Sequence, residues 1–322
     1  MKRRHLMALA AVAALAPKTL LAQKKFRIAT LDDAVEGIRA AAWATFRRRL
    51  GELGLGDVAY ESRYARGEPK KLPALAQELA RRKPDVFVTA GTSATVAAMK
   101  TTTSIPIVFA GAGAGDPVGT GLVASLARPG GNVTGTSLPG LEILDKSFES
   151  LRELTPGAKS YAYLTDASNK ASGLSFPHLQ EKARKLKVSI LMLDAREASV
   201  LEKSFAAIRR ERVQGLLVGL AAVMLEHRGH IVQFAARERL PAVYSRREYV
   251  DAGGLMSCGG DVQALYLRTA EYVRRVLGGA RPADLPVEQV SGTRIVLNMK
   301  AAHAAGITVP RALRTRADEV IE

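Results

Sequence analysis

The chain has 322 residues and carries 47 Lys and Arg against 31 Asp and Glu, a formal net charge of +16. This length is enough for two domains with a large core, and the single cysteine, Cys258, excludes an internal disulfide. A strong positive charge is typical of proteins that bind nucleic acid. However, the charges are dispersed along helix faces, without an aromatic-rich basic strand or a helix-turn-helix, so we expect no nucleic-acid partner.

The N-terminus has the pattern of a secretory signal peptide. Lys2, Arg3 and Arg4 precede an uncharged run from Leu6 to Ala16, which is too short to span a bilayer in the mature protein. We place the signal peptide at residues 1–22, because cleavage after Ala16 would leave Pro17 at the new terminus. The paired arginines also suit a twin-arginine signal. A buried N-terminal helix is the alternative reading.

The predicted cleavage site has no cysteine near it, which excludes a lipid anchor on the mature N-terminus. An exported protein without an anchor is retained only if an outer membrane encloses it. We therefore expect a periplasmic protein that is free of the membrane.

Apolar strand-like runs alternate with amphipathic helices through the first half of the chain. Short apolar runs separated by helices indicate a parallel sheet that is covered on both faces. The expected strands are 26–31, 58–64, 86–90 and 107–110, and the expected helices are 37–53, 72–79 and one starting near residue 93.

A glycine-rich stretch, PIVFAGAGAGDPVGTGLVASLARPGGNVTGTS, occupies residues 106–137. Glycines at the end of a strand let the backbone approach a ligand closely, so this loop could cradle a phosphate, line a cleft or act as a hinge. It is not a nucleotide fingerprint, because Asp116 or Val118 stands where G-x-G-x-x-G requires glycine, and the chain has no P-loop motif. We expect Gly111 and Ser137 to face a cleft.

The same alternation restarts after Ser137, which predicts a second α/β lobe. A helical stripe over residues 141–151 leads into strands and helices that continue to residue 244. The expected division is 23–137 plus 259–285 for the first lobe and 138–258 plus 286–322 for the second. The fold class is therefore α/β, with two doubly wound parallel-sheet lobes joined by a hinge and a ligand cleft between them.

A strand ends and a helix begins at Ala90-Gly91-Thr92-Ser93. Thr92 or Ser93 could cap this helix and leave free backbone N–H groups pointing into the cleft, where the helix dipole would favour a carboxylate or another anion. The alternative is an ordinary helix cap without a ligand.

Other polar residues follow the ends of predicted strands and face the same region. Asp32 or Asp166 could accept an ammonium group, and Tyr244 could contact an apolar moiety. The complete set of expected ligand-binding residues is Thr30, Asp32, Gly91, Thr92, Ser93, Gly111, Ser137, Asp166, Tyr244 and Arg246.

Signals for catalysis and metal binding are weak. His227 and His230 could share a helix face, but no second ligand motif accompanies them. Cys258 has no base evident in the sequence, and no G-x-S-x-G elbow is present. We expect no catalytic residue, no metal and no cofactor.

Several long motifs carry a resemblance to a known family. PIVFAGAGAGDPVGTGLVASLARPGGNVTG, REYVDAGGLMSCGGD, GARPADLPVEQV and NMKAAHAAGITVP closely resemble the ABC-transporter substrate-binding family that includes tryptophan-binding lipoproteins. The resemblance covers the mature chain and implies the type I periplasmic-binding-protein fold, with three hinge crossings and a ligand between two lobes. Some relatives bind aromatic amino acids.

This chain departs from the family's pattern at three places. Cys258-Gly259-Gly260 stands where the family often has Tyr-Gly-Pro, the loop before Asp116 is longer by a residue or two, and Leu31-Asp32-Asp33 replaces the usual glycine- and serine-rich turn. If these positions line the cleft, an aromatic ligand is doubtful.

The resemblance and the residues together predict a periplasmic receptor of an ABC importer. It would close as a monomer around a small polar ligand that bears a carboxylate, an amino acid or a related molecule, and deliver it to a permease in the inner membrane. An extracytoplasmic sensor that signals to a membrane kinase is the alternative, and an enzyme ranks third.

Overall fold

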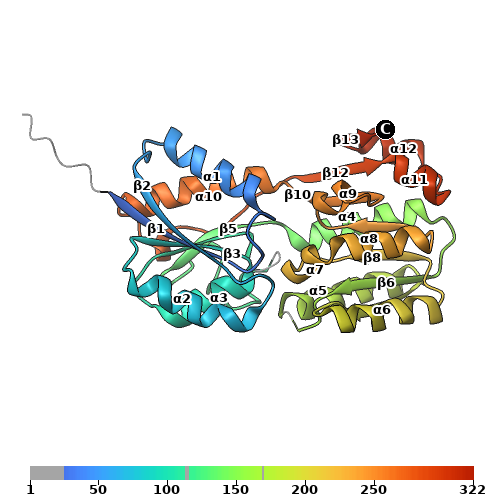
Figure 1. Ribbon diagram of the computed structural model, residues 1–322, viewed down its shortest axis with the longest axis horizontal. Helices are drawn as coiled ribbons and strands as arrows, with labels where there is room; N and C mark the ends of the chain where they lie inside the picture. The colour runs from blue at the N-terminus through green and yellow to red at the C-terminus, as the bar shows by residue number, and fades with distance from the viewer. Residues whose placement is uncertain (1–24, 113–115, 169) are drawn as a thin grey trace, which may run out of the picture.

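The computed structural model describes residues 25–112, 116–168 and 170–322, so the predicted signal peptide at residues 1–22 lies outside the described residues. Two α/β lobes lie end to end and are joined by chain segments that pass between them (Figure 1). This arrangement confirms the predicted fold class.

The first lobe is built on a six-stranded parallel sheet in the order β11-β5-β4-β3-β1-β2. Its central strands read as continuous apolar runs because helices cover both faces, α1 and α10 on one and α2 and α3 on the other (Figure 1). The strands are β1 (Phe26–Asp32), β2 (Val58–Tyr64), β3 (Val86–Ala90), β4 (Ile107–Ala110), β5 (Val133–Ser137) and β11 (Glu288–Gln289). The helices are α1 (Ala40–Glu52), η1 (Pro69–Lys71), α2 (Leu72–Arg81), α3 (Thr92–Thr101), α10 (Val262–Leu277) and η3 (Pro282–Asp284).

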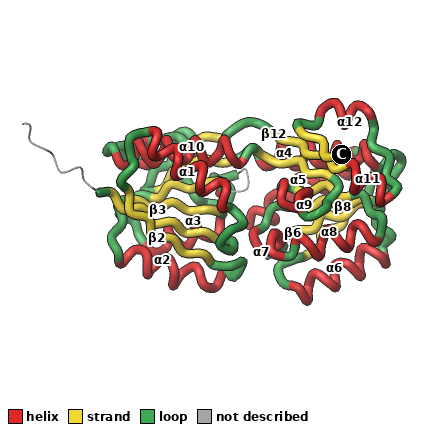
Figure 2. Tube along the Cα trace, turned by 45° about the horizontal axis from the view of Figure 1, so that its top comes forward, coloured by secondary structure: helices red, strands yellow, loops and turns green. Residues whose placement is uncertain are grey.

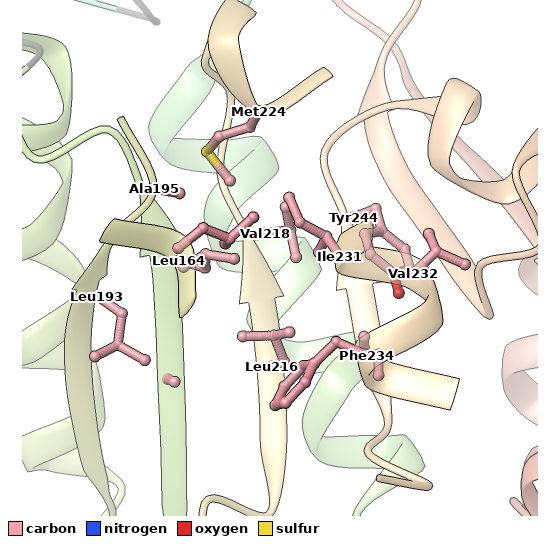
Figure 3. Close-up of a cluster of buried hydrophobic side chains, with 14 of the residues drawn as sticks. Leu164, Leu193, Ala195, Leu216, Val218, Met224, Ile231, Val232, Phe234 and Tyr244 are labelled. Atoms are coloured by element: carbon pink, nitrogen blue, oxygen red, sulfur yellow. The ribbon is translucent and has the colours of Figure 1, made fainter. Parts of the chain in front are cut away.

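The second lobe has a seven-stranded sheet in the order β13-β12-β10-β9-β8-β6-β7, in which β12 runs antiparallel to β10. Figure 3 shows its core, where Leu164, Leu216 and Phe234 meet between the sheet and α8. The strands are β6 (Ser160–Thr165), β7 (Ser189–Asp194), β8 (Gly215–Val218), β9 (Ala242–Tyr244), β10 (Met256–Gly260), β12 (Thr293–Asn298) and β13 (Glu319–Ile321). The helices are α4 (Gly140–Leu154), α5 (Lys170–Lys185), α6 (Ala198–Arg210), α7 (Ala222–Glu226), α8 (Arg228–Arg237), α9 (Arg247–Asp251), α11 (Met299–Ala305) and α12 (Arg311–Arg316).

The chain crosses between the lobes from β5 to α4, from β10 to α10 and from β11 to β12. Figure 2 shows α10 on the first lobe's side of this junction and α4 and β12 on the second lobe's side. Gly259 and Gly260 pair with β12 in the second sheet, and Glu288 and Gln289 pair with β5 in the first. These pairings differ from the predicted boundaries, which assigned 259–285 to the first lobe and 286–322 to the second. The reason is that β11 and β12 are nearly continuous strands and β10 runs directly into α10, so no loop marks either crossing in the sequence.

Gly135 on β5 allows this strand to pack closely against β4 in the first lobe. A Cβ atom on Gly135 would lie 2.3 Å from the carbonyl oxygen of Phe109 and 2.6 Å from its backbone nitrogen. Both are backbone atoms of the paired strand β4, so they cannot move without disturbing the sheet. Glycine is therefore required where the chain runs toward the hinge.

We predict that Gly135→Ala lowers the free energy of unfolding by about 1–3 kcal/mol, the usual cost of overpacking a well-packed core. The matched control is Gly131→Ala, because nothing lies within 4 Å of a Cβ at that position. Urea denaturation measures both variants. Equal stability of the two would show that β4 and β5 are not packed this closely.

Candidate functional site

The carboxyl ends of the parallel strands in both lobes border a cavity between the lobes, which has two adjoining compartments. The charged compartment has a polar lining of Asp33, Arg39, Gly91, Thr92, Arg246 and Tyr266. The apolar compartment is lined chiefly by Leu138, Ile143, Leu144, Leu217, Val218 and Leu220. The space open to the centre of a water molecule is about 60 Å³ in the charged compartment and about 100 Å³ in the apolar one. A single water needs only ~10–15 Å³ on this measure, so the cavity has room for a small organic molecule.

The hydroxyl groups at the apolar compartment are bonded within the protein. Ser147 Oγ donates to the carbonyl oxygens of Ile143 at 2.8 Å and Cys258 at 3.1 Å. Ser172 Oγ shares a hydrogen bond with Thr165 Oγ1 at 2.8 Å, and Ser245 Oγ donates to the Gly219 carbonyl at 2.9 Å. Because these groups are already satisfied, the compartment suits an apolar group better than a polar one.

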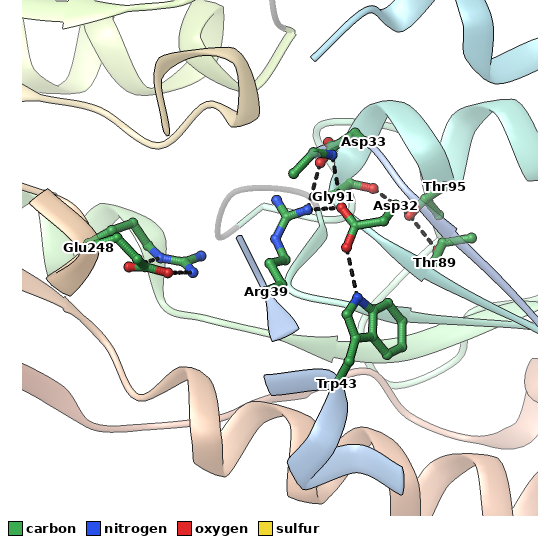
Figure 4. A network of polar contacts seen from close by, with 10 residues as sticks. Asp32, Asp33, Arg39, Trp43, Thr89, Gly91, Thr95 and Glu248 are labelled. Carbon is green, nitrogen blue, oxygen red and sulfur yellow. Dashed lines mark hydrogen bonds and ion pairs between the residues drawn. The ribbon is translucent and has the colours of Figure 1, made fainter. Parts of the chain in front are cut away.

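Asp32, at the end of β1, anchors the first lobe's side of the charged compartment (Figure 4). Its carboxylate accepts hydrogen bonds from Trp43 Nε1 at 2.8 Å and from the backbone N–H of Ala34 at 2.9 Å, and it forms an ion pair with Arg39. The residue is 1 % exposed. Asp32 is therefore enclosed by donors from its own lobe and does not line the cavity, which differs from its expected contact with a ligand ammonium.

The Asp33 carboxylate lies at the start of α3, where we expected a ligand anion from the sequence. A Cβ on Gly91 would lie 1.9 Å from Asp33 Oδ2, so this carboxylate lies directly against the start of α3. The N-cap residue of α3 is Gly91, with φ +90°, which has no side chain to cap the helix. The predicted cap by Thr92 or Ser93 is therefore wrong, because these two are the first residues of the helix itself.

Arg39 links the two aspartates. Its Nη1 donates to Asp33 Oδ1 at 2.9 Å and also contacts Asp32 Oδ1. Burial raises the pKa of Asp33, the charge of Arg39 opposes this, and the neighbouring Asp32 adds to the rise. Arg39 therefore balances two carboxylates with one positive charge.

The second lobe contributes an ion pair to the charged compartment. Arg246 donates to Glu248 from Nε at 3.2 Å and from Nη2 at 2.5 Å. Burial alone would raise the pKa of Glu248, but the charge and hydrogen bonds of Arg246 lower it, and Arg39 of the opposite lobe contributes. Two ion pairs therefore face each other across the cavity, Asp33 with Arg39 in the first lobe and Glu248 with Arg246 in the second.

Of the residues expected to bind ligand, the cavity brings together Gly91, Thr92, Gly111 and Arg246. The structure places Tyr244 elsewhere. Its ring stacks on Tyr249 at 4.9 Å inside the second lobe, because this strand side chain points to the face that α8 covers.

The other expected residues do not line either compartment. Thr30 Oγ1 donates to Ser62 Oγ at 2.7 Å, and Asp166 accepts from the N–H and hydroxyl of Ser168 at 2.9 and 2.6 Å. Ser137 is buried in β5, where its Oγ has no hydrogen-bond partner among the described residues, and Ser93 lies in the first turn of α3. The sequence placed these residues at or just after the ends of strands but did not give the direction of their side chains.

Arg39 and Tyr266 were missed because no local motif marks them. Arg39 directly precedes α1 and Tyr266 lies on α10; these two helices are separated by most of the chain and pack together on one face of the first sheet. Their sequence signal is no more than a polar residue at or within an amphipathic helix.

Metal chemistry and membrane insertion find no support in the part of the chain that the structure describes. No group of three or more His, Cys, Asp and Glu side chains there could hold a metal ion. No helix among the same residues has the length and apolarity needed to cross a membrane.

Comparisons with known proteins give a consistent picture. The model of the family described as ABC transporter substrate binding protein matches residues 31–321. A tyrosine-binding protein of Clostridioides difficile (strain R20291) is 26% identical over 256 residues, which are 79% of this chain and 73% of that protein. The family and this relative are substrate-binding proteins rather than enzymes.

Solved structures share the fold over most of the chain. A conserved domain protein from Vibrio cholerae has a TM-score of 0.86 at 26% identity, covering 92% of this chain and 100% of that one. An ABC domain from Streptococcus pneumoniae in complex with L-Trp has a TM-score of 0.83 at 24% identity, with the same coverage.

We predict that Arg39→Gln lowers the free energy of unfolding by about 3–5 kcal/mol, because it leaves two buried carboxylates without their cation. The control is Arg48→Gln on α1, the helix that Arg39 precedes; its ion pair with Glu52 at 3.8 Å is exposed, with 67% of the arginine side chain accessible. Loss of that pair should change stability by at most about 1 kcal/mol. Chemical denaturation distinguishes the two, and similar losses would contradict the anchoring role of Arg39.

Proposed function

Because this chain belongs to the family of ABC transporter substrate-binding proteins, we propose that it is the periplasmic receptor of an importer for an amino acid with an aliphatic side chain. The observation that carries the proposal is the junction of a charged and an apolar compartment between the lobes. An amino acid likewise carries its charged groups and its apolar side chain only a few bonds apart. The tyrosine-binding relative supports a ligand of this class.

Arg246 is the residue we assign to the ligand carboxylate. It lines both compartments, and its two bonds to Glu248 use Nε and Nη2. The N–H groups of Nη1 are not part of that pair, and a guanidinium donates readily to a carboxylate. A carboxylate at this junction would leave the ligand side chain directed into the apolar compartment.

The apolar compartment favours an aliphatic side chain over an aromatic one. Seven of its 17 lining residues are leucine, isoleucine or valine, and Tyr163 is the one aromatic residue in its lining among the described residues. Tyr163 Oη would lie 2.7 Å from a Cβ on Gly219, so the edge of this ring is already close to the cavity wall. The compartment therefore offers branched aliphatic contacts and little surface for ring stacking.

Transport would follow from closure of the lobes. No bond is made or broken; the ligand contacts both lobes, and its greater number of contacts with the closed form shifts the equilibrium toward that form. The closed receptor would then deliver the ligand to a permease in the inner membrane. The predicted signal peptide is the reason for placing this step in the periplasm.

The direct test is isothermal titration calorimetry of the purified protein with L-leucine, L-tryptophan, L-glutamate and D-glucose. We expect L-leucine to bind more tightly than L-tryptophan, and L-glutamate and D-glucose to give no binding. Binding of the sugar without binding of any amino acid would overturn the proposed ligand class.

We predict that Leu220→Asp weakens L-leucine binding at least about 10-fold, because a charged side chain replaces an apolar wall shared by both compartments. Leu191→Asp is the matched control, since Leu191 lies on β7 of the same lobe, away from both compartments, and is 37% exposed like Leu220. Its affinity should stay within about twofold of the unsubstituted protein. An equal loss in both variants would argue against ligand contact at Leu220.

A further inference from the structure

We propose that Asp33 and Tyr266 form a cation subsite in the charged compartment, so that the ligand must carry an ammonium group next to its apolar part. This inference rests on the proposed function, because it places the ligand in the cavity between the lobes. It goes further by assigning the charge that the ligand presents to the first lobe.

The balance of charges favours a cation. On the first lobe's side of the charged compartment, Asp32 and Asp33 share one guanidinium group, that of Arg39. Arg246 of the second lobe is paired with Glu248, so the first lobe's cluster has one carboxyl group more than it has cations. Burial of an uncompensated charge is costly, and a ligand cation would remove that cost.

Asp33 is the carboxylate that a ligand can reach. Asp32 is enclosed by Arg39, Trp43 and the Ala34 N–H, and Glu248 is engaged twice by Arg246. Asp33 lines the cavity itself, and its side chain is 14% exposed. Because its carboxylate lies against the start of α3, it also blocks that helix end from receiving a ligand anion.

The hydroxyl group of Tyr266 is a second, independent observation that favours a polar ligand group in the charged compartment. Its residue is 2% exposed and lines the charged compartment, yet its Oη has no hydrogen-bond partner among the described residues. The ring packs edge-to-face on Trp43 with 5.1 Å between centroids, which holds the hydroxyl in place. Five buried side-chain oxygens of the described residues have no hydrogen-bond partner, and Tyr266 is the one of these residues that lines the cavity between the lobes.

An ammonium group satisfies both residues at once. It offers three N–H donors and no acceptor, so one donor can meet the Asp33 carboxylate and another the Tyr266 oxygen. Burial raises the pKa of Tyr266, which keeps its hydroxyl neutral and able to accept. Together with Arg246 at the junction, this arrangement would recognise the two charged groups of an amino acid from opposite lobes.

The test uses calorimetry with three probes that share the leucine side chain: L-leucine, 3-methylbutylamine, which lacks the carboxylate, and 4-methylpentanoate, which lacks the amine. We expect L-leucine to bind best, the amine to bind more weakly and the acid to give no binding. Binding of the acid with no binding of the amine would overturn the cation subsite and leave the proposed receptor function standing. No binding of these probes or of any other amino acid would overturn the proposed function, and this inference with it.

Substitutions of Asp33 and of Tyr266 test the location of the subsite. Asp33→Asn should weaken binding of L-leucine and of the amine about 10- to 100-fold. Asp57→Asn is the control on an exposed aspartate of the same lobe, paired with Lys25 at 3.0 Å, and should leave both affinities unchanged. Unchanged binding by a folded Asp33→Asn protein would overturn the assignment.

If the Asp33→Asn variant does not fold, the Tyr266→Phe variant still tests the cation subsite. It removes only an oxygen that has no partner within the described residues, so thermal unfolding should be little changed. We expect a 3- to 10-fold loss of affinity for L-leucine and the amine. An affinity equal to that of the unsubstituted protein would contradict the subsite.

Discussion

The ion pairs of Arg39 with Asp32 and Asp33 hold together the part of the molecule on which the site depends. They join the start of α1 to the carboxyl end of β1, and Trp43 of the same helix donates to Asp32 from one turn further along. Trp43 also packs against Tyr266 of α10, so one network fixes two helices and a strand end. A buried polar network of this kind is rigid when all its groups have partners. The cavity begins at Asp33 and Tyr266, the members of the network that we assign to the ligand.

The two lobes contribute to the cavity in different ways. The first lobe supplies Asp33, Arg39 and Tyr266, while the second supplies most of the aliphatic wall and the Arg246–Glu248 pair. A ligand that needs both sets of contacts binds fully only when the lobes are together, which is the physical basis for coupling ligand recognition to closure. The three crossings permit that motion, and Gly135 shows how tightly the chain is packed where it approaches the first of them.

The architecture could be predicted because it depends on patterns that repeat along the chain. Continuous apolar strands and amphipathic helices such as Leu72–Arg81 follow from periodicity alone, and the long motifs indicated the family. The positions of Gly91, Gly111 and Arg246 followed from the rule that parallel strands end at one edge of a sheet. The direction of each side chain did not follow, so Tyr244 and Asp166 were expected in the cavity but lie in the interior of their lobe. The role of Asp33 depends on Arg39 and Gly91, which come from different elements, and only the folded chain brings them together.

The central claim is that one amino acid spans the charged and apolar compartments with its ammonium group toward the first lobe. A crystal structure of the protein with L-leucine tests it most directly. The account predicts the ligand nitrogen within hydrogen-bond distance of Asp33 and Tyr266, the carboxylate at Arg246, and the side chain among Leu138, Leu217 and Leu220. A ligand carboxylate at the start of α3, with Asp33 displaced from Gly91, would contradict it.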